Sequence, residues 1–202
     1  MRALVVATTN PDKVREIREL LAGLSITLKT LSDFAAIAPP AETGTTFQEN
    51  ARQKALFYAR ATQALVVAED SGLEVDALGG APGVQSARFG GEDATYAEKF
   101  ALLYESLRQV NVVTSPARFV CALAVADSEA VVFEARGTVE GFIASEPRGL
   151  GGFGYDPIFF YPPFGCTLAE AGARKNEVSH RAHAFRELRR MLETQVTTGA
   201  GA

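Results

Sequence analysis

A chain of 202 residues, 47% hydrophobic and 22% charged, has enough apolar sequence to bury one sizeable core. Its net charge of -4 disfavours a general nucleic-acid binder, which needs a broad basic face. No stretch reaches eighteen apolar residues and no cleavage site follows the apolar run 3–7, so we expect neither a membrane span nor a signal peptide. The cysteines, Cys121 and Cys166, have no ligand spacing, which indicates a reducing, cytoplasmic setting with Cys121 as a core residue.

The first part of the chain is predicted to run strand, helix, loop, helix, strand. Short apolar runs typical of buried strands occur at 3–7 and 64–68. Asn10 followed by Pro11 suits the N-cap and the first residue of a helix. After a loop rich in Pro and Thr, a capping box predicts a second helix over 47–62.

The second part adds helices and a hairpin. A capping box at Thr95 and Glu98 predicts a helix whose apolar face consists of Phe100, Leu103, Leu107 and Val110. Further strands are predicted at 118–126, 130–136 and 157–161, a last helix at 178–193, and a disordered tail at 194–202.

Strands that alternate with helices indicate an α/β fold. The hairpin predicted at 118–136 argues against an all-parallel sheet, so we expect a mixed one. Without internal repeats or a long linker, residues 1–193 are expected to form a single domain.

The first candidate site follows the first predicted strand. Thr8, Thr9, Asn10 and Lys13 lie where a helix begins, and free N–H groups at a helix N-terminus favour an anion. The chain contains no P-loop pattern. Phosphate binding is therefore one interpretation, and an ordinary capped helix is the other.

Two carboxylates form the second candidate. Glu42 lies in the Pro-rich loop, and Asp70 is expected at the end of the strand at 64–68, where α/β proteins bind ligands. Asn50 and Lys54 share one face of the intervening helix because they are four residues apart. A magnesium site is one interpretation. A solvated loop charge and a turn-forming aspartate are the alternative.

Two later segments are also candidates for ligand contacts. Gly152 and Gly154 free the backbone to approach a ligand, while Phe153 offers a stacking surface and Asp156 an acceptor. The alternative is a loop whose aromatic side chains close the core. The segment 175–181 places three cationic or potentially cationic side chains at the start of a helix, and a solvated basic face is the alternative interpretation.

Together these segments resemble the inosine triphosphate pyrophosphatase family, also described as non-canonical purine NTP pyrophosphatases. Five blocks match in family order: Ala7–Glu16, Glu42–Ala55, Asp70–Arg88, Gly152–Pro157 and Lys175–Arg181. The chain departs from the family pattern at Glu69, where aspartate is usual, and at Gln85 and Phe89, where tyrosine is usual. Only Glu69 lies beside a residue that the resemblance makes catalytic.

The resemblance implies hydrolysis of ITP, dITP or XTP to the monophosphate and pyrophosphate. It implies that Glu42 and Asp70 bind Mg²⁺, and that Asp70 is also the general base. It implies triphosphate contacts from Thr8, Thr9, Asn10, Lys13 and Lys54, a substrate contact from Ser71, and a base pocket formed by Phe153, Gly154, Tyr155, Asp156, Lys175, His180 and Arg181. The family fold is a long twisted mixed sheet flanked by helices, with a substrate cleft between two lobes, and its members are usually homodimers.

Two other functions stay open from the sequence. One is a related pyrophosphatase that acts on modified pyrimidine or methylated nucleotides. The other is a nucleotide-binding sensor without catalysis, which would need a broken metal or base position. Lys13, Glu42, Lys54 and Asp70 are all present, and this argues against the sensor.

Overall fold

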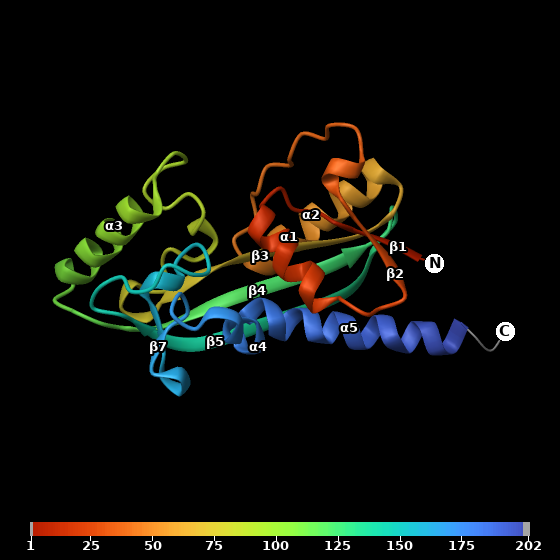
Figure 1. Cartoon of the computed structure of the whole chain (residues 1–202). Helices are drawn as coiled ribbons and strands as arrows, with labels where there is room; N and C mark the ends of the chain where they lie inside the picture. Colours follow the sequence, from red (N-terminus) through yellow and green to blue (C-terminus); the bar gives the residue numbers. More distant parts are fainter. Residues whose placement is uncertain (1, 200–202) are drawn as a thin grey trace. The chain divides into compact units, whose positions relative to one another are not determined.

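The computed structural model describes residues 2–199, and side chains for residues 3–194. The described strands form one sheet in the order β2-β1-β3-β4-β5-β6-β7 (Figure 1). The strands are β1 Arg2–Val6, β2 Ile26–Thr30, β3 Leu65–Val75, β4 Pro116–Ala126, β5 Val131–Ile143, β6 Phe159–Tyr161 and β7 Cys166–Thr167. The α-helices are α1 Pro11–Leu20, α2 Phe47–Thr62, α3 Tyr96–Gln109, α4 Lys175–Val178 and α5 His180–Gly199.

The sheet is mixed, as predicted. β1 pairs in parallel with both β2 and β3, and Leu4 lies opposite Leu65 in the second of these ladders. β6 pairs antiparallel with β5 and with β7. The α/β fold class is therefore confirmed, whereas the cleft between two lobes stays a prediction.

β3 is longer than predicted, and the prediction that Asp70 ends the strand is wrong. The strand does not end at Asp70 but continues through Ser71 and Gly72 to Val75. These two residues suggested a turn because both are common in turns. Gly72 instead fits within the strand because a Cβ there would lie only 2.7 Å from the Gly83 carbonyl oxygen.

The described chain divides into two compact units. The first unit consists of Met1–Asp70, Cys121–Gly137 and His180–Ala202, as far as these segments are described. Its core joins side chains from β1, α1, β3, β4 and α5: Leu4, Val6, Ile17, Leu21, Val67, Leu123, Val125, Phe185 and Leu188. Gly137 permits close packing within this unit, since a Cβ there would lie 2.6 Å from the backbone nitrogen of Ala184 in α5.

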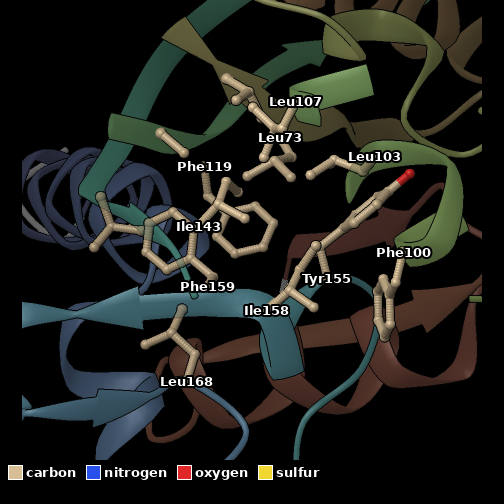
Figure 2. Close-up of a cluster of buried hydrophobic side chains, with 13 residues drawn as sticks. Leu73, Phe100, Leu103, Leu107, Phe119, Ile143, Tyr155, Ile158, Phe159 and Leu168 are labelled. Carbon is tan, nitrogen blue, oxygen red and sulfur yellow. The ribbon is translucent and has the colours of Figure 1, made fainter. Parts of the chain in front are cut away.

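The second unit consists of Ser71–Val120 and Thr138–Ser179. Its core packs the apolar face of α3 against strand residues, including Leu73, Phe119 and Phe159 (Figure 2). Val110 was expected on that apolar face but is 47% exposed. The helix ends at Gln109 and Val110 is its C-cap, so its side chain lies outside the helical periodicity.

The last helix also differs from its predicted bounds. α5 begins at His180 rather than at 178 and continues beyond 193 to Gly199. Part of the predicted tail is therefore helical in the described chain, and residues 200–202 lie outside the described residues. None of the described helices combines the length and apolarity that crossing a membrane requires.

Candidate active site

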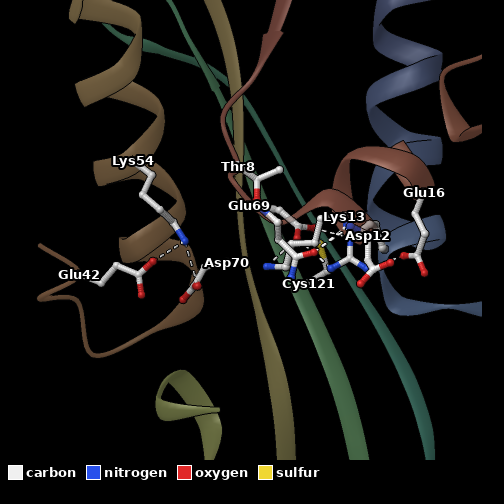
Figure 3. A network of polar contacts seen from close by, with 11 residues as sticks. Thr8, Asp12, Lys13, Glu16, Glu42, Lys54, Glu69, Asp70 and Cys121 are labelled. Carbon is white, nitrogen blue, oxygen red and sulfur yellow. Dashed lines mark hydrogen bonds and ion pairs between the residues drawn. The ribbon is translucent and has the colours of Figure 1, made fainter. Parts of the chain in front are cut away.

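Two carboxylates of the first unit meet at one ammonium group. The Lys54 Nζ atom lies 2.9 Å from Glu42 Oε1 and 3.0 Å from Asp70 Oδ1 (Figure 3). Asn50 donates from Nδ2 to the other Asp70 oxygen, Oδ2, at 3.0 Å. A loop, a helix and a strand thus bring four polar side chains together, and the predicted Asn50–Lys54 face is the side of α2 that takes part.

The start of α2 holds the loop that carries Glu42. Thr46 and Glu49 form the predicted capping box, and the helix begins at Phe47 as expected. The Gly44 backbone N–H donates to Asn50 Oδ1 at 2.8 Å, and a Cβ at Gly44 would lie only 2.7 Å from Glu49 Cβ. The side chain that orients Asp70 therefore also ties the Glu42 loop to the helix.

The charges around Lys54 favour a further cation. Burial alone would lower the pKa of the Lys54 ammonium, but Asp70 and Glu42 outweigh burial and raise that pKa. One ammonium and two carboxylates give this trio a net charge of about -1. Mg²⁺ takes one or two carboxylates and completes its shell with water or substrate phosphate. Glu42 and Asp70 fit this donor set, and in the described part of the chain no cluster of three or more His, Cys, Asp or Glu would hold a metal alone.

In the segment after β1, the Lys13 side chain is better placed to bind an anion than the backbone N–H groups are. Asn10 is the N-cap of α1, and its Oδ1 accepts from the N–H groups of Asp12 at 2.9 Å and Lys13 at 3.2 Å. Thr8 Oγ1 accepts from the Asn10 N–H, while Thr9 is exposed. Two of the N–H groups expected to receive an anion are thus already bonded. The Lys13 ammonium, whose side chain is 20% exposed, is the cationic group of this segment.

A buried ionic network lies beside Lys13. Arg181 donates from Nε and Nη2 to the two oxygens of Glu69, each at 2.8 Å, and from Nη1 to Glu16 Oε2 at 2.6 Å. Glu69 Oε1 also pairs with Lys13 Nζ at 2.9 Å. The Cys121 thiol donates to Glu69 Oε2 at 3.0 Å, and burial raises the pKa of this thiol well above its usual range, as expected for a core cysteine.

The glycine-rich segment is well packed in the second unit. The buried Asp156 accepts at Oδ2 from Lys175 Nζ at 2.7 Å and from the Phe153 N–H at 2.8 Å. Lys175 Nζ also lies 4.4 Å from the centroid of the Phe153 ring. Gly152 has φ +67°, and a Cβ there would meet the Asp156 carboxylate, so this turn requires glycine.

The aromatic neighbour of this turn is equally constrained. Tyr155 donates its hydroxyl to the Ser86 carbonyl at 2.9 Å, and its ring meets Tyr96 edge to face. Burial raises the pKa of the Tyr155 hydroxyl. The segment therefore combines a fixed aromatic ring, a buried carboxylate and a buried ammonium.

The comparisons with known proteins now identify the family. Residues 4–191 match the model of the Ham1 family, which is nearly the whole described chain. The chain belongs to the Ham1 family. The dITP/XTP pyrophosphatase of Geobacillus kaustophilus is 46% identical over 202 residues, covering 100% of this chain and 98% of the relative.

Further Ham1-family relatives agree with this assignment. A dITP/XTP pyrophosphatase of Thermus thermophilus is 51% identical over 188 residues, covering 92% of this chain and 89% of the relative. The solved structure of a HAM1 protein from Coxiella burnetii superposes with a TM-score of 0.89 at 39% identity, covering 96% of this chain and 100% of that structure. The resemblance inferred from the sequence blocks is therefore confirmed.

The site residues that the family resemblance implies are distributed over both units. The first unit contains Thr8, Thr9, Asn10, Lys13, Glu42, Lys54, Asp70, His180 and Arg181, and the second contains Ser71, Phe153, Gly154, Tyr155, Asp156 and Lys175. Within the first unit, the structure brings Glu42, Lys54 and Asp70 together; within the second, Phe153, Asp156 and Lys175. The role of Arg181 in the base pocket stays a prediction.

The sequence interpretation missed the carboxylates around Arg181. Glu16 matched a family block and Glu69 was noted as a departure, but neither was placed in a network. A signal existed for Glu16, which precedes the buried Ile17 on α1 and is itself only 4% exposed. A charged side chain that is buried to this extent is almost always paired.

Proposed function

We propose that this Ham1-family chain hydrolyses ITP, dITP and XTP to the nucleoside monophosphate and pyrophosphate. The proposal is supported by relatives named dITP/XTP pyrophosphatase that match almost the full chain. The observation that carries it is the convergence of Glu42 and Asp70 on the Lys54 ammonium. These are the groups that a magnesium-bound triphosphate requires: carboxylate oxygens for the metal and a cation for the phosphates.

In the proposed mechanism Asp70 is the general base. Its carboxylate takes a proton from water as the water oxygen bonds to the α-phosphorus. The bond from that phosphorus to the β-phosphate oxygen breaks, so pyrophosphate leaves intact. Lys54 and Asn50 hold the two Asp70 oxygens in place for this transfer. Mg²⁺ held by Glu42 and Asp70 would neutralise phosphate charge and make hydroxide accessible near neutral pH.

Lys13 and Lys54 are proposed to bind the triphosphate. A nucleoside triphosphate brings about four negative charges, and cations aimed at the phosphates stabilise the charge of the transition state. Thr8, Thr9 and Asn10 complete this part of the proposed substrate contact, and Ser71 is proposed to contact the substrate next to Asp70.

The segment around Phe153 is proposed to recognise the base. Stacking on Phe153 does not tell inosine from adenosine, because every base has a π-face. A 6-oxo purine offers an acceptor at O6 and a donor at N1, and adenine offers the reverse. A donor from Lys175 toward O6 and an acceptor from Asp156 toward N1–H would therefore match a 6-oxo purine and oppose adenine, which presents a donor and an acceptor in the reversed places. Gly154 and Tyr155 are proposed to complete the recognition segment. The family resemblance also implies base contacts from His180 and Arg181, but the Arg181 guanidinium already donates to Glu69 and Glu16.

A substrate panel tests the proposed function. With Mg²⁺ present, we expect ITP, dITP and XTP to release pyrophosphate at far higher kcat/KM than ATP or GTP. Equal turnover of ATP and ITP, or formation of IDP and orthophosphate, would contradict the proposal. Faster turnover of thymidine or methylated triphosphates would favour the rival pyrophosphatase, and nucleotide binding without any turnover would favour the sensor.

Glu42→Gln is expected to raise the Mg²⁺ concentration required for half-maximal turnover by about tenfold or more. The substitution removes one of the two proposed carboxylate ligands and keeps the side-chain volume. Initial rates measured across a Mg²⁺ titration check this, with Glu134→Gln as the control because Glu134 is an exposed residue of β5. An unchanged titration would remove Glu42 from the metal site.

A homodimer is the assembly proposed from the family resemblance. Light scattering of the purified chain across a dilution series would measure its mass, and a monomer at every concentration would reject this assembly.

A further inference from the structure

Glu69 is the centre of the buried ionic network, and its side chain is only 2% exposed. Its Oε1 atom receives Lys13 Nζ and Arg181 Nη2, and its Oε2 atom receives Arg181 Nε and the Cys121 thiol (Figure 3). These donors match the roughly four lone-pair sites that the two oxygens of a carboxylate offer. Glu69 is therefore placed to hold other groups rather than to react itself.

The adjacent carboxylate has different partners. Asp70 contacts Lys54 and Asn50, and neither of these residues is among the four donors to Glu69. The two neighbouring residues of β3 thus have separate tasks: Asp70 belongs to the proposed catalytic group, and Glu69 belongs to the group around Lys13.

Arg181 and Glu16 keep the Glu69 carboxylate fixed. The guanidinium binds both Glu69 oxygens in a bidentate pair, the geometry that best defines the orientation of a carboxylate. Glu16 occupies a further guanidinium nitrogen from α1, and the Arg181 side chain is only 1% exposed. Two cations and two carboxylates cancel in charge within this network, which permits its burial.

Lys13 is the member of the network that reaches solvent. Its side chain is 20% exposed, whereas those of Glu16, Glu69 and Arg181 are at most 6% exposed. An ammonium group has three N–H donors, and the ion pair with Glu69 uses one of them. An exposed lysine otherwise samples many rotamers, so the fixed carboxylate decides where this ammonium lies.

We propose that Glu69 is a positioning residue for Lys13, with Arg181 and Glu16 as its buried supports. The fixed carboxylate holds the Lys13 ammonium where it meets the phosphates of the substrate. The inference rests on the proposed function of Lys13 in triphosphate binding, and it assigns Glu69 a role that acts only through this lysine.

A double-mutant cycle tests this dependence. Lys13→Ala and Glu69→Gln are made singly and together, and kcat/KM for dITP is measured alongside the affinity for inorganic tripolyphosphate by calorimetry. We expect Lys13→Ala to lower kcat/KM by about a hundredfold and Glu69→Gln by about tenfold to a hundredfold. In the Lys13→Ala background, Glu69→Gln is expected to change neither quantity by more than about twofold, because the group it positions is gone.

A purely structural role for Glu69 would give a different result. Glu69→Gln would then lower kcat/KM and tripolyphosphate affinity by the same factor in the Lys13→Ala background as in the wild type. Equal losses in the two backgrounds would overturn the proposal. Wild-type kcat/KM and wild-type tripolyphosphate affinity in a folded Glu69→Gln variant would also overturn it. Glu69→Asp keeps the charge that Arg181 needs and is measured where Glu69→Gln fails to fold. Because aspartate is usual at this position in the family, Glu69→Asp is expected to keep tripolyphosphate binding through Lys13. A loss of affinity in Glu69→Asp that persists in the Lys13→Ala background would overturn the proposal.

The control and the second readout separate this inference from the proposed function. Glu134 forms an exposed ion pair with Arg52. Glu134→Gln is therefore expected to leave kcat/KM and tripolyphosphate affinity unchanged, both in the wild type and in the Lys13→Ala variant. If the wild type released no pyrophosphate from any nucleotide of the panel, the proposed function would fail. The tripolyphosphate cycle would still decide whether Glu69 acts through Lys13, because it measures binding without turnover.

Discussion

Asp70→Asn is expected to lower pyrophosphate release by about a thousandfold or more while the chain stays folded. The substitution keeps the side-chain volume and one oxygen that can accept from Lys54 or Asn50. It removes the negative charge that would bind Mg²⁺ and the base that would take a proton from water. Steady-state kinetics with dITP measure the loss, and the melting temperature is expected to change by no more than roughly 5 °C.

Asp76→Asn is the matched control for this prediction. It makes the same chemical change six residues later, in an aspartate whose side chain is 43% exposed and pairs with Arg118. Surface ion pairs contribute little, so this variant is expected to keep wild-type activity. Wild-type-like pyrophosphate release by Asp70→Asn would remove Asp70 from the catalytic role, and an equal loss in Asp76→Asn would mean that the effect is not specific to the site.

Arg181→Ala is expected to lower the free energy of unfolding by about 3–5 kcal/mol near neutral pH. The guanidinium is the shared partner of Glu16 and Glu69, and its removal leaves two buried carboxylates without their main counter-charge. Urea denaturation of the variant and the wild type measures the difference. Arg190→Ala on the same helix is the control, because its ion pair with Glu187 is exposed and its loss is expected to cost less than about 0.5 kcal/mol.

The effect of Arg181→Ala should depend on pH. Burial would raise the pKa of the Glu69 carboxyl, but the charges of Arg181 and Lys13 outweigh burial and hold that pKa well below its usual range. A carboxyl with a depressed folded pKa contributes stability above its unfolded pKa, and this contribution is lost as the pH falls through the folded pKa. In the variant, buried carboxylates can instead take up protons. The difference in the free energy of unfolding between the wild type and Arg181→Ala should therefore become smaller as the pH falls. A difference that stays constant or grows in acid would contradict the ionic explanation.

Local sequence determined where the main helices begin and much of what the chain does. The Asn10 and Thr46 caps lie next to the first residues of α1 and α2, because a cap bonds to N–H groups two or three residues away. The same short range places Asn50 and Lys54 on one face of α2. The family blocks are also local patterns, and the relatives confirm the family that they indicated.

Tertiary structure alone decided the length of β3 and the partners of the buried charges. Ser71 and Gly72 have turn-forming chemistry, and the tight space beside Gly83 keeps Gly72 within a strand nonetheless. Arg181 looked like one member of a basic surface segment, yet it bonds with Glu69, 112 positions away, and with Glu16, 165 positions away. Caps and periodicity depend on neighbours within a few residues, whereas the state of a charged side chain depends on which distant groups surround it once the core has formed.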